Sequence, residues 1–188
     1  DLELNEEQKE YTAMIIEQAD RLTNLVDRLL GPNYLPVMKL QNIHMVIEKV
    51  FQLTKFDNPK NIILARDYDP SIPELTFDQD KIQQTVINIV DGASKITLRT
   101  RAASNKTING KRIKLCAEIS IIDNGPGIPE HIQSTLFYPM VSGRASGTGL
   151  GLSICQTIIH QHHGKLSCIS RPGHTEFTIL IPFESEIK

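Results

Sequence analysis

Apolar side chains recur at helical spacing through the first thirty residues of the chain. One heptad seam holds Leu4, Tyr11, Ile15, Leu22, Leu25 and Leu29, and the opposite face is largely acidic. Gly31-Pro32 then stops the pattern. This predicts a helix over 5–30 that packs on another helix or on a partner chain, because so wide a seam is not stable alone. The alternative is a helix that docks on the core of the domain that follows.

From residue 37 onward, helical and strand-like patterns alternate. Helices are predicted over 42–55, after Asp78 and over 150–162, and strands over 61–66, 96–100, 113–122, 165–170 and 175–181. Asn109-Gly110 predicts a hairpin between the two central strands, and Arg171-Pro172-Gly173 predicts another. This order predicts an α/β sandwich in which helices cover one face of an open mixed sheet.

The helix after Asp78 has an apolar face that is expected to turn toward the core. Asp78 is the predicted N-cap, and the predicted inward side chains are Ile82, Val86, Ile87 and Val90. This helix also carries Asn88.

The composition argues against a nucleic-acid-binding protein and against a membrane protein. The chain has 20 Lys and Arg against 22 Asp and Glu, a net charge of −2, which gives no footprint for non-specific nucleic-acid binding. There is no apolar run of membrane-spanning length and no signal peptide in the sequence. Three cysteines, an odd number without CxxC spacing, are expected to be buried free thiols in a reducing cytoplasm. The start at Asp1 suggests a fragment of a longer protein.

The run Asp123-Asn124-Gly125-Pro126-Gly127 joins a carboxylate to a glycine turn directly after an apolar strand. Such a carboxylate can accept a hydrogen bond from the exocyclic amine of adenine, and the glycines allow the backbone to approach the ring. The alternative is a simple turn between two elements.

A second glycine cluster, Gly147-Thr148-Gly149-Leu150-Gly151-Leu152, opens a predicted helix. Free amides at a helix N-terminus suit phosphate groups, although this is not the P-loop pattern. Taken alone, the cluster could be a flexible connector. Two such motifs about twenty residues apart, with Phe137-Tyr138 between them, predict a nucleotide site.

These motifs together resemble the conserved boxes of sensor histidine kinases of two-component systems. Asp123 to Gly127 is similar to their first glycine box, Leu136-Phe137-Tyr138 to their F box, 147–152 to their second glycine box, and 173–177 to their late Gly-x-Thr-x-Phe strand. Residues 137–144 and 28–32 are similar to the nitrogen-regulation branch of that family. The resemblance implies a Bergerat-type (GHKL) ATP-binding catalytic domain over 33–188. Residues 1–32 would then be the second helix of a dimerisation and phosphoacceptor hairpin.

The resemblance also implies roles for individual residues. Asp123 would bind the adenine amino group, with Thr175 nearby through water, and Gly125 and Gly127 would shape that end. The phosphates would lie on Gly147, Thr148, Gly149, Leu150, Gly151 and Leu152. Phe137 belongs to a lid over 134–146, in which Arg144 either approaches the γ-phosphate or is a solvated charge.

Two departures from the family pattern bear on activity. No phosphoacceptor histidine motif surrounds any of the six histidines, which are His44, His131, His160, His162, His163 and His174. We expect that the hairpin's first helix, with its histidine, is missing from this sequence. The last helix ends in His160, His162 and His163, for which a helix-end role is expected and a metal site is the alternative.

The second departure concerns Mg²⁺. Asn88 matches the first of two asparagines in the family's N box, and the second asparagine would hold the metal against the phosphates. Here the helix stops at Val90-Asp91-Gly92. Three explanations remain open: Asp91 substitutes, a segment of the chain is absent after Val90, or the domain binds nucleotide without metal. Asn88 is therefore the candidate metal ligand.

The implied function is transfer of the ATP γ-phosphate to a histidine outside this sequence, and then to the response regulator NtrC. The resemblance further implies a homodimer and regulation by the PII signal protein. An alternative is a nucleotide-binding or interaction module that is catalytically incompetent in this form. An ATPase of the chaperone or topoisomerase kind is disfavoured by the short lid and the helix over 5–30.

Overall fold

The computed structural model describes residues 11–12, 14–16, 35–56, 62–90, 95–142 and 149–183. The chain divides into two compact units, Asp1–Leu35 and Pro36–Lys188. In the first unit, residues 11–12 and 14–16 are helical, and the side chains of Met14 and Ile15 are more than half exposed. The rest of the helix predicted over 5–30 lies outside the described residues.

The second unit is built on a five-stranded sheet. Its strands, in spatial order, are β2 (Ile63–Asp67), β4 (Lys95–Ile108), β5 (Lys111–Asp123), β7 (His174–Pro182) and β6 (Lys165–Arg171). β2 runs parallel to β4, and the other neighbours are antiparallel. A separate two-stranded sheet pairs β1 (Lys39–Gln41) with β3 (Leu75–Phe77) and was not predicted. The predicted mixed sheet is confirmed.

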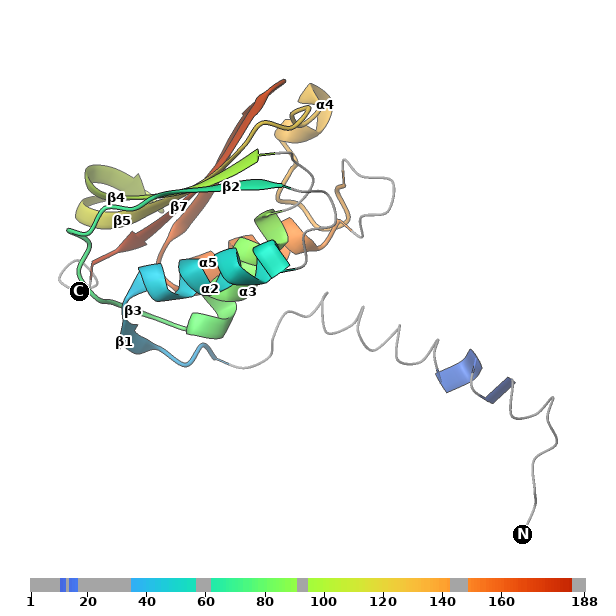
Figure 1. Ribbon diagram of the computed structural model, residues 1–188, viewed down its shortest axis with the longest axis horizontal. Helices are drawn as coiled ribbons and strands as arrows, with labels where there is room; N and C mark the ends of the chain where they lie inside the picture. The colour runs from blue at the N-terminus through green and yellow to red at the C-terminus, as the bar shows by residue number, and fades with distance from the viewer. Residues whose placement is uncertain are drawn as a thin grey trace, which may run out of the picture. The chain divides into compact units, whose positions relative to one another are not determined.

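Three helices lie on one face of this sheet: α2 (Ile43–Phe56), α3 (Gln79–Ile89) and α5 (Gly151–Gln161) (Figure 1). The main apolar core fills the space between the layers, with fully buried side chains such as Ile47, Ile82 and Ile159 from the helices and Leu98, Ile119 and Ile179 from the strands. The short α4 (Glu130–Gln133) follows the end of β5. The predicted α/β sandwich is therefore confirmed. None of the helices described here has the length and apolar character needed to span a membrane.

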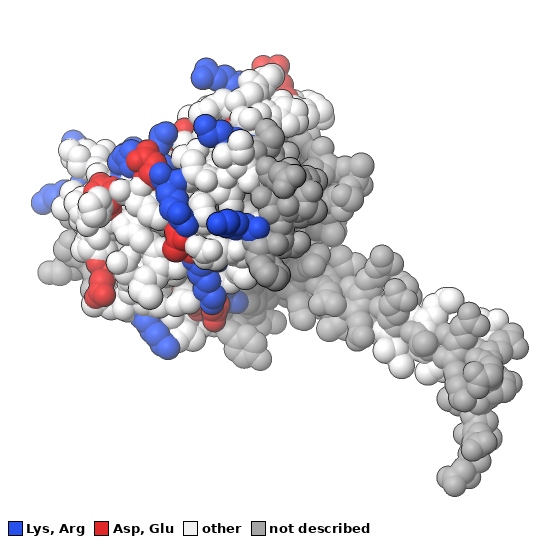
Figure 2. All heavy atoms as spheres, viewed as in Figure 1, with Lys and Arg blue, Asp and Glu red and all other residues white. Residues whose placement is uncertain are grey.

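The other face of the sheet carries charged side chains on β2 and β4, because strand side chains alternate between faces. On β4, Leu98 points into the core, while Arg99 and Arg101 both pair with Asp67. The space-filling view shows Lys and Arg side chains interspersed with Asp and Glu on the side it presents (Figure 2).

The face that α3 buries differs by one position from the prediction. Ile82, Thr85, Val86 and Ile89 are buried, whereas Ile87 is 42% exposed. The buried set follows the i, i+3, i+4, i+7 spacing, and Ile87 falls outside it. Thr85 is tolerated inside because its hydroxyl donates to the Lys81 carbonyl at 3.0 Å. The prediction that Ile87 faces inward is wrong.

The central hairpin extends well beyond the two strands predicted from apolar residues. The predicted turn is confirmed, with Asn109 and Gly110 at φ +49° and +80°. The flanking residues, expected to form a polar loop, instead continue the ladder to the Ile108–Lys111 pair. Ile108, Ile113 and Leu180 contribute to a second, smaller apolar cluster, which stabilises this extension. Pairing thus extends into a polar stretch that has no apolar run of its own.

All three cysteines are free thiols, as predicted. Cys116 and Cys155 are buried, and Cys168 is half-buried. Burial raises the pKa of the Cys155 thiol to about 11, so this thiol is protonated and unreactive near neutral pH.

Candidate nucleotide-binding site

Asp123 occupies the last position of β5, on the face that the helices cover. Ile119 and Ile121 precede it at alternate positions and are buried in the core. Because side chains alternate along a strand, the carboxylate ends this apolar row. A half-buried carboxylate is therefore held at the edge of the core. There it can accept a hydrogen bond from the polar edge of a ligand ring whose faces lie against apolar side chains.

Two hydroxyl side chains lie next to Asp123 on the neighbouring strands of the sheet. Asp123 pairs in register with Thr175 on β7, and Thr175 pairs with Ser170 on β6. Thr175 is 4% exposed, and its Oγ1 lies 2.9 Å from Ser170 Oγ. Ser170 was not predicted as a site residue. Its only sequence signal is its place opposite Thr175 in the last predicted hairpin.

The glycine turn after Asp123 presses against the turn between β6 and β7. The Gly125 N–H donates to Asp123 Oδ1 at 2.7 Å, and the Gly173 N–H donates to the Gly125 carbonyl at 2.9 Å. Gly127 has φ +83°, and a Cβ there would lie 2.8 Å from the Arg171 carbonyl carbon. Only glycine allows this approach, so the turn is fixed in front of the Asp123–Thr175 pair.

The segment after the glycine turn is hydrogen-bonded to Ser170, which lies beside Thr175. The Ile128 N–H donates to Ser170 Oγ at 2.8 Å, and the Gln133 side-chain amide donates to the Ile128 carbonyl at 2.7 Å. Further along, Phe137 is half-buried against the main core. The predicted lid thus begins from an anchored base.

The second glycine cluster leads into α5. The N-cap Leu150 is buried and makes no side-chain cap to the helix. The first amides of a helix have no partner within it, so those of Gly151, Leu152 and Ser153 can receive an anion. The Ser153 hydroxyl donates to the Leu150 carbonyl at 2.9 Å.

Asn88 on α3 lies beside the start of α5. Its side-chain nitrogen donates to Cys155 Sγ at 3.8 Å, and a Cβ placed on Gly151 would lie 3.9 Å from its Cγ. With the nitrogen turned to Cys155, the amide oxygen is the atom left for a cation. Within the described residues, no group of three or more His, Cys, Asp or Glu side chains could hold a metal. A Mg²⁺ ion held here would have the Asn88 oxygen as a ligand and would draw its other ligands from phosphate and water.

Gly149 permits a close contact between the α5 entrance and the segment that follows the F box. Its φ is +70°, and a Cβ there would lie 2.5 Å from the Met140 carbonyl carbon and 2.7 Å from the Val141 nitrogen. The need for glycine at this position is therefore explained by backbone packing as well as by any approach of phosphate.

The predicted site residues fall into two groups. The group predicted to bind the base, called the base end here, contains Asp123, Gly125, Gly127 and Thr175, and the group predicted to bind the phosphates and the metal, called the phosphate end, contains Asn88, Gly149, Leu150, Gly151 and Leu152. Arg144, Gly147 and Thr148 lie outside the described residues, as does Asp91. The resemblance placed these residues in one site, and the described contacts connect those within each group.

His162 has a role that the sequence did not reveal. It is 1% exposed, and its Nε2 accepts the Asp78 N–H at 2.9 Å while Nδ1 donates to the Ile158 carbonyl at 2.7 Å. The ring joins the end of α5 to the start of α3, where Asp78 is the predicted N-cap. Burial lowers the pKa of His162, so the ring is neutral rather than cationic at neutral pH.

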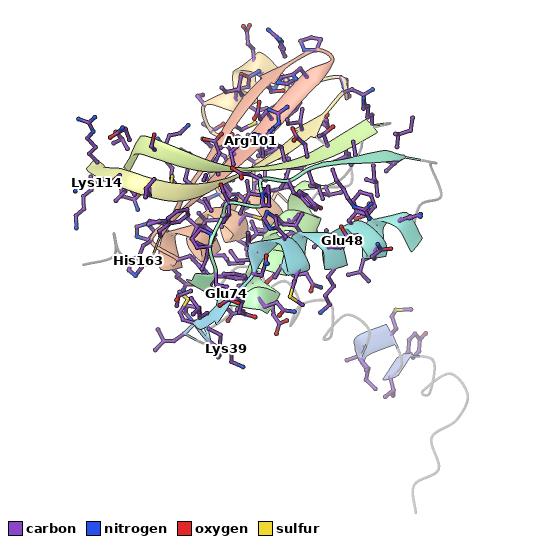
Figure 3. The ribbon with its side chains drawn as sticks, turned by 60° about the vertical axis from the view of Figure 1, so that its left-hand side comes forward. Lys39, Glu48, Glu74, Arg101, Lys114 and His163 are labelled. Atoms are coloured by element: carbon purple, nitrogen blue, oxygen red, sulfur yellow. The ribbon has the colours of Figure 1, made fainter. Side chains whose placement is uncertain are left out.

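A hollow of about 570 Å³ lies elsewhere, along β1 and α2. Its lining includes Leu40, Met45, Glu48 and Glu74, and none of the predicted site residues. Figure 3 places Glu48 on α2 and Glu74 next to the small sheet. The hollow is therefore separate from both ends of the candidate site.

Comparison with known proteins agrees with this geometry. Residues 77–185 match the family described as "Histidine kinase-, DNA gyrase B-, and HSP90-like ATPase". The protein named "Sensory histidine kinase/phosphatase NtrB" of Klebsiella oxytoca is 55% identical over 181 residues, which cover 92% of this chain and 52% of that protein. The chain thus spans about half the length of the curated relatives it matches.

Two solved structures are similar across the fold. The catalytic domain of the histidine kinase ThkA has a TM-score of 0.65 at 28% identity, covering 78% of this chain and 95% of that one. ThkA in complex with the response regulator protein TrrA has a TM-score of 0.68 at 25% identity, covering 100% of this chain and 55% of that one.

Proposed function

The chain belongs to the family of histidine kinase-, DNA gyrase B- and HSP90-like ATPases, and we propose that it binds ATP between the two ends of the candidate site. Its catalytic domain is of the NtrB-like histidine kinase type. The observation that carries the proposal is the row of Asp123 and Thr175 at the core edge, together with the start of α5, where Leu150 makes no side-chain cap. Each element matches one part of the nucleotide.

At the base end, the Asp123 carboxylate accepts a hydrogen bond from the adenine amino group. The ring lies over the apolar edge of the core, where Phe137 is half-buried. Thr175 supplies a hydroxyl beside the carboxylate. An acceptor next to apolar surface favours a base with an exocyclic amine at that position.

At the phosphate end, the amides at the start of α5 receive phosphate oxygens. Mg²⁺ would be held by the Asn88 side-chain oxygen and by the phosphates, and when bound it supplies charge neutralisation for phosphoryl transfer. Gly149 keeps the backbone of Met140 and Val141 close to this entrance. Arg144, Gly147 and Thr148 belong to this end by their place in the motif.

In the intact protein, the γ-phosphoryl group passes from ATP to a histidine nitrogen on a helix outside this sequence, and ADP leaves. The phosphoryl group then passes to an aspartate of an NtrC-like response regulator, and a PII signal protein sets the balance between transfer and removal. Residues 1–32 serve as the second helix of the dimerisation hairpin, and 33–188 as the catalytic domain of a cytoplasmic homodimer. The similarity to the NtrB relative supports the histidine kinase assignment, and the ThkA–TrrA complex supports a response regulator as the partner.

The test supplies the missing histidine in trans. The chain is incubated with a separate phosphoacceptor helical hairpin, Mg²⁺ and ATP labelled on its γ-phosphate. We expect label on the hairpin's histidine, and less of it with the Asp123→Asn variant. ATP binding without any transfer would instead support the alternative, a nucleotide-binding module that is incompetent in this form.

A further inference from the structure

We propose that Ser170 is a positioning residue that sets the nucleotide specificity of the site. It does so by fixing the Thr175 hydroxyl as a hydrogen-bond donor toward the base. This inference rests on the proposed function, because it assigns the polarity of the base end. It comes from the contacts of Ser170, whose Oγ lies within hydrogen-bond distance of both Ile128 and Thr175.

The direction of the first bond is fixed by chemistry. An amide nitrogen can only donate, so Ser170 Oγ accepts the Ile128 N–H at 2.8 Å. The Ser170 hydroxyl still has one proton to give, and Thr175 Oγ1 lies 2.9 Å away. Ser170 therefore accepts from the Ile128 N–H and donates its own proton to Thr175 Oγ1. In this arrangement both donors, the Ile128 N–H and the Ser170 O–H, have an acceptor.

Asp123 fixes the direction of the second bond. Its carboxylate is the register partner of Thr175 on the other side, and directly opposed side chains on neighbouring strands have Cβ atoms about 4.5–5.5 Å apart. The negative charge attracts the positive end of the Thr175 hydroxyl dipole. Thr175 therefore accepts from Ser170 and turns its own proton toward Asp123 and the bound base.

The resulting pattern is an acceptor beside a donor. The Asp123 carboxylate accepts and the Thr175 hydroxyl donates, directly or through one water. Adenine offers the complementary pair, an amino donor at C6 and an acceptor at N1. Guanine offers the reverse, a carbonyl oxygen at C6 and an N–H at N1, so it would face acceptor with acceptor and donor with donor. A site built on a buried donor rejects a ligand that cannot accept from it.

Ser170 is needed because Thr175 could otherwise turn the other way. Without a donor on β6, the Thr175 proton is free to rotate toward a backbone carbonyl, and its oxygen would then face the base as an acceptor. Since Thr175 is 4% exposed, bulk water does not supply the missing donor.

The experiment compares ATP with 1-deaza-ATP, which lacks the N1 acceptor and keeps the amino group. Affinities of the full chain for both ligands are measured by titration calorimetry in the wild type and in Ser170→Ala. We expect the wild type to prefer ATP about tenfold, the factor that one hydrogen bond contributes. In Ser170→Ala we expect that preference to fall to about threefold.

Three controls separate positioning from a general structural effect. Ser170→Thr retains the hydroxyl and is expected to keep the wild-type preference. Ser167→Ala lies on the same strand with its side chain on the opposite face, and is expected to change neither affinity. Thermal unfolding of each variant reports its folding, and Ser170→Cys, with a weak donor of similar size, replaces Ser170→Ala if that variant does not fold.

Equal loss of affinity for both ligands in Ser170→Ala, with the preference unchanged, would overturn the inference and leave Ser170 as a structural residue. A wild type that prefers ATP no more than 1-deaza-ATP would also overturn it, because Thr175 would then not donate to N1. A wild type that binds neither ligand would contradict the proposed function itself. The two failures are therefore distinguishable.

Discussion

The two ends of the candidate site are built by different means. At the base end, Asp123, Thr175 and Ser170 are set by the register of three paired strands. At the phosphate end, Asn88 and Gly151 meet where two helices pack, and Gly149 joins them through a tight backbone contact. Strand pairing positions the first group through a ladder of hydrogen bonds, whereas side-chain packing positions the second.

The two ends are therefore sensitive to different kinds of substitution. The base end depends on side-chain chemistry within a rigid frame, so conservative substitutions there are expected to alter recognition more than folding. The phosphate end depends on close approach and on helix placement, so substitutions there are expected to alter stability and geometry together.

The largest effect is expected for Gly149→Ala. The left-handed φ costs about 1 kcal/mol for a residue with a Cβ, and the contact with the Met140 and Val141 backbone adds about 1–3 kcal/mol. We expect the free energy of unfolding to fall by about 2–4 kcal/mol in denaturant titrations. Gly110→Ala is the matched control, because it has φ +80° and nothing within 4 Å of a Cβ. If both variants lose the same amount, the close approach at Gly149 contributes nothing.

Asp123→Asn tests the base end. The amide oxygen can still accept the Gly125 N–H, so the fold is expected to stay intact. The charged acceptor for the adenine amine is lost, and ATP binding is expected to weaken by about 1–3 kcal/mol in calorimetric titrations. Asp67→Asn on the outer face of the sheet is the control, and its ATP affinity is expected to match the wild type. If Asp123→Asn binds ATP with unchanged affinity, the Asp123 turn has only a structural role.

Asn88→Ala tests the metal-holding part of the phosphate end. Only the Mg²⁺-dependent component of ATP binding is expected to decrease, by about tenfold or ~1.4 kcal/mol. Binding measured in the presence of a chelator is expected to be the same in variant and wild type. Gln84→Ala, an exposed position on the same helix, serves as the matched control. An equal loss with and without Mg²⁺ would show that Asn88 supports packing rather than the metal.

The smallest effect is expected from acidification, through His162. Burial lowers the pKa of this ring, with Asp78 opposing the shift and His163 adding to it. The unfolded chain therefore takes up a proton near pH 6.5 that the folded state does not accept until lower pH. The free energy of unfolding is expected to fall as the pH drops from 7.5 through 6.5.

A variant separates His162 from other titrating groups. His162→Gln is expected to be less stable at pH 7.5, and its stability is expected to change less than that of the wild type between pH 7.5 and 6. The carboxyl of Asp78 does not contribute there: although burial opposes it, the backbone donors at Lys81, Val37 and Asp80 keep its pKa below the ordinary value. Parallel pH curves for the two proteins would contradict this role of His162.

Local signals in the sequence predicted the parts of the site that local structure determines. Asp78 was predicted as a helix cap, and Asn109-Gly110 as a turn, because each depends on its immediate neighbours. The Asp123 carboxylate could be placed at a strand end for the same reason. The chemistry of ATP came from the resemblance of ordered motifs, not from any one residue.

Long-range contacts could not be predicted in this way. His162 reaches Asp78 across 84 positions in sequence, and Ser170 receives the Ile128 N–H across 42. Neither residue belongs to a glycine box, and each acquires its role only when two elements pack or pair. The position of Ile87 was predicted wrongly for a related reason, because a buried Thr85 breaks the apolar pattern that marks the helix face.

The pairing of β5 with β7 has a consequence for folding kinetics. The hairpins β4–β5 and β6–β7 join residues close in sequence, but Asp123 and Thr175 meet only when the two hairpins come together across the intervening helices and loops. Contacts of such large sequence separation form slowly because a long loop must close first. The base end is thus among the last features to assemble, so ATP binding would report a completed fold.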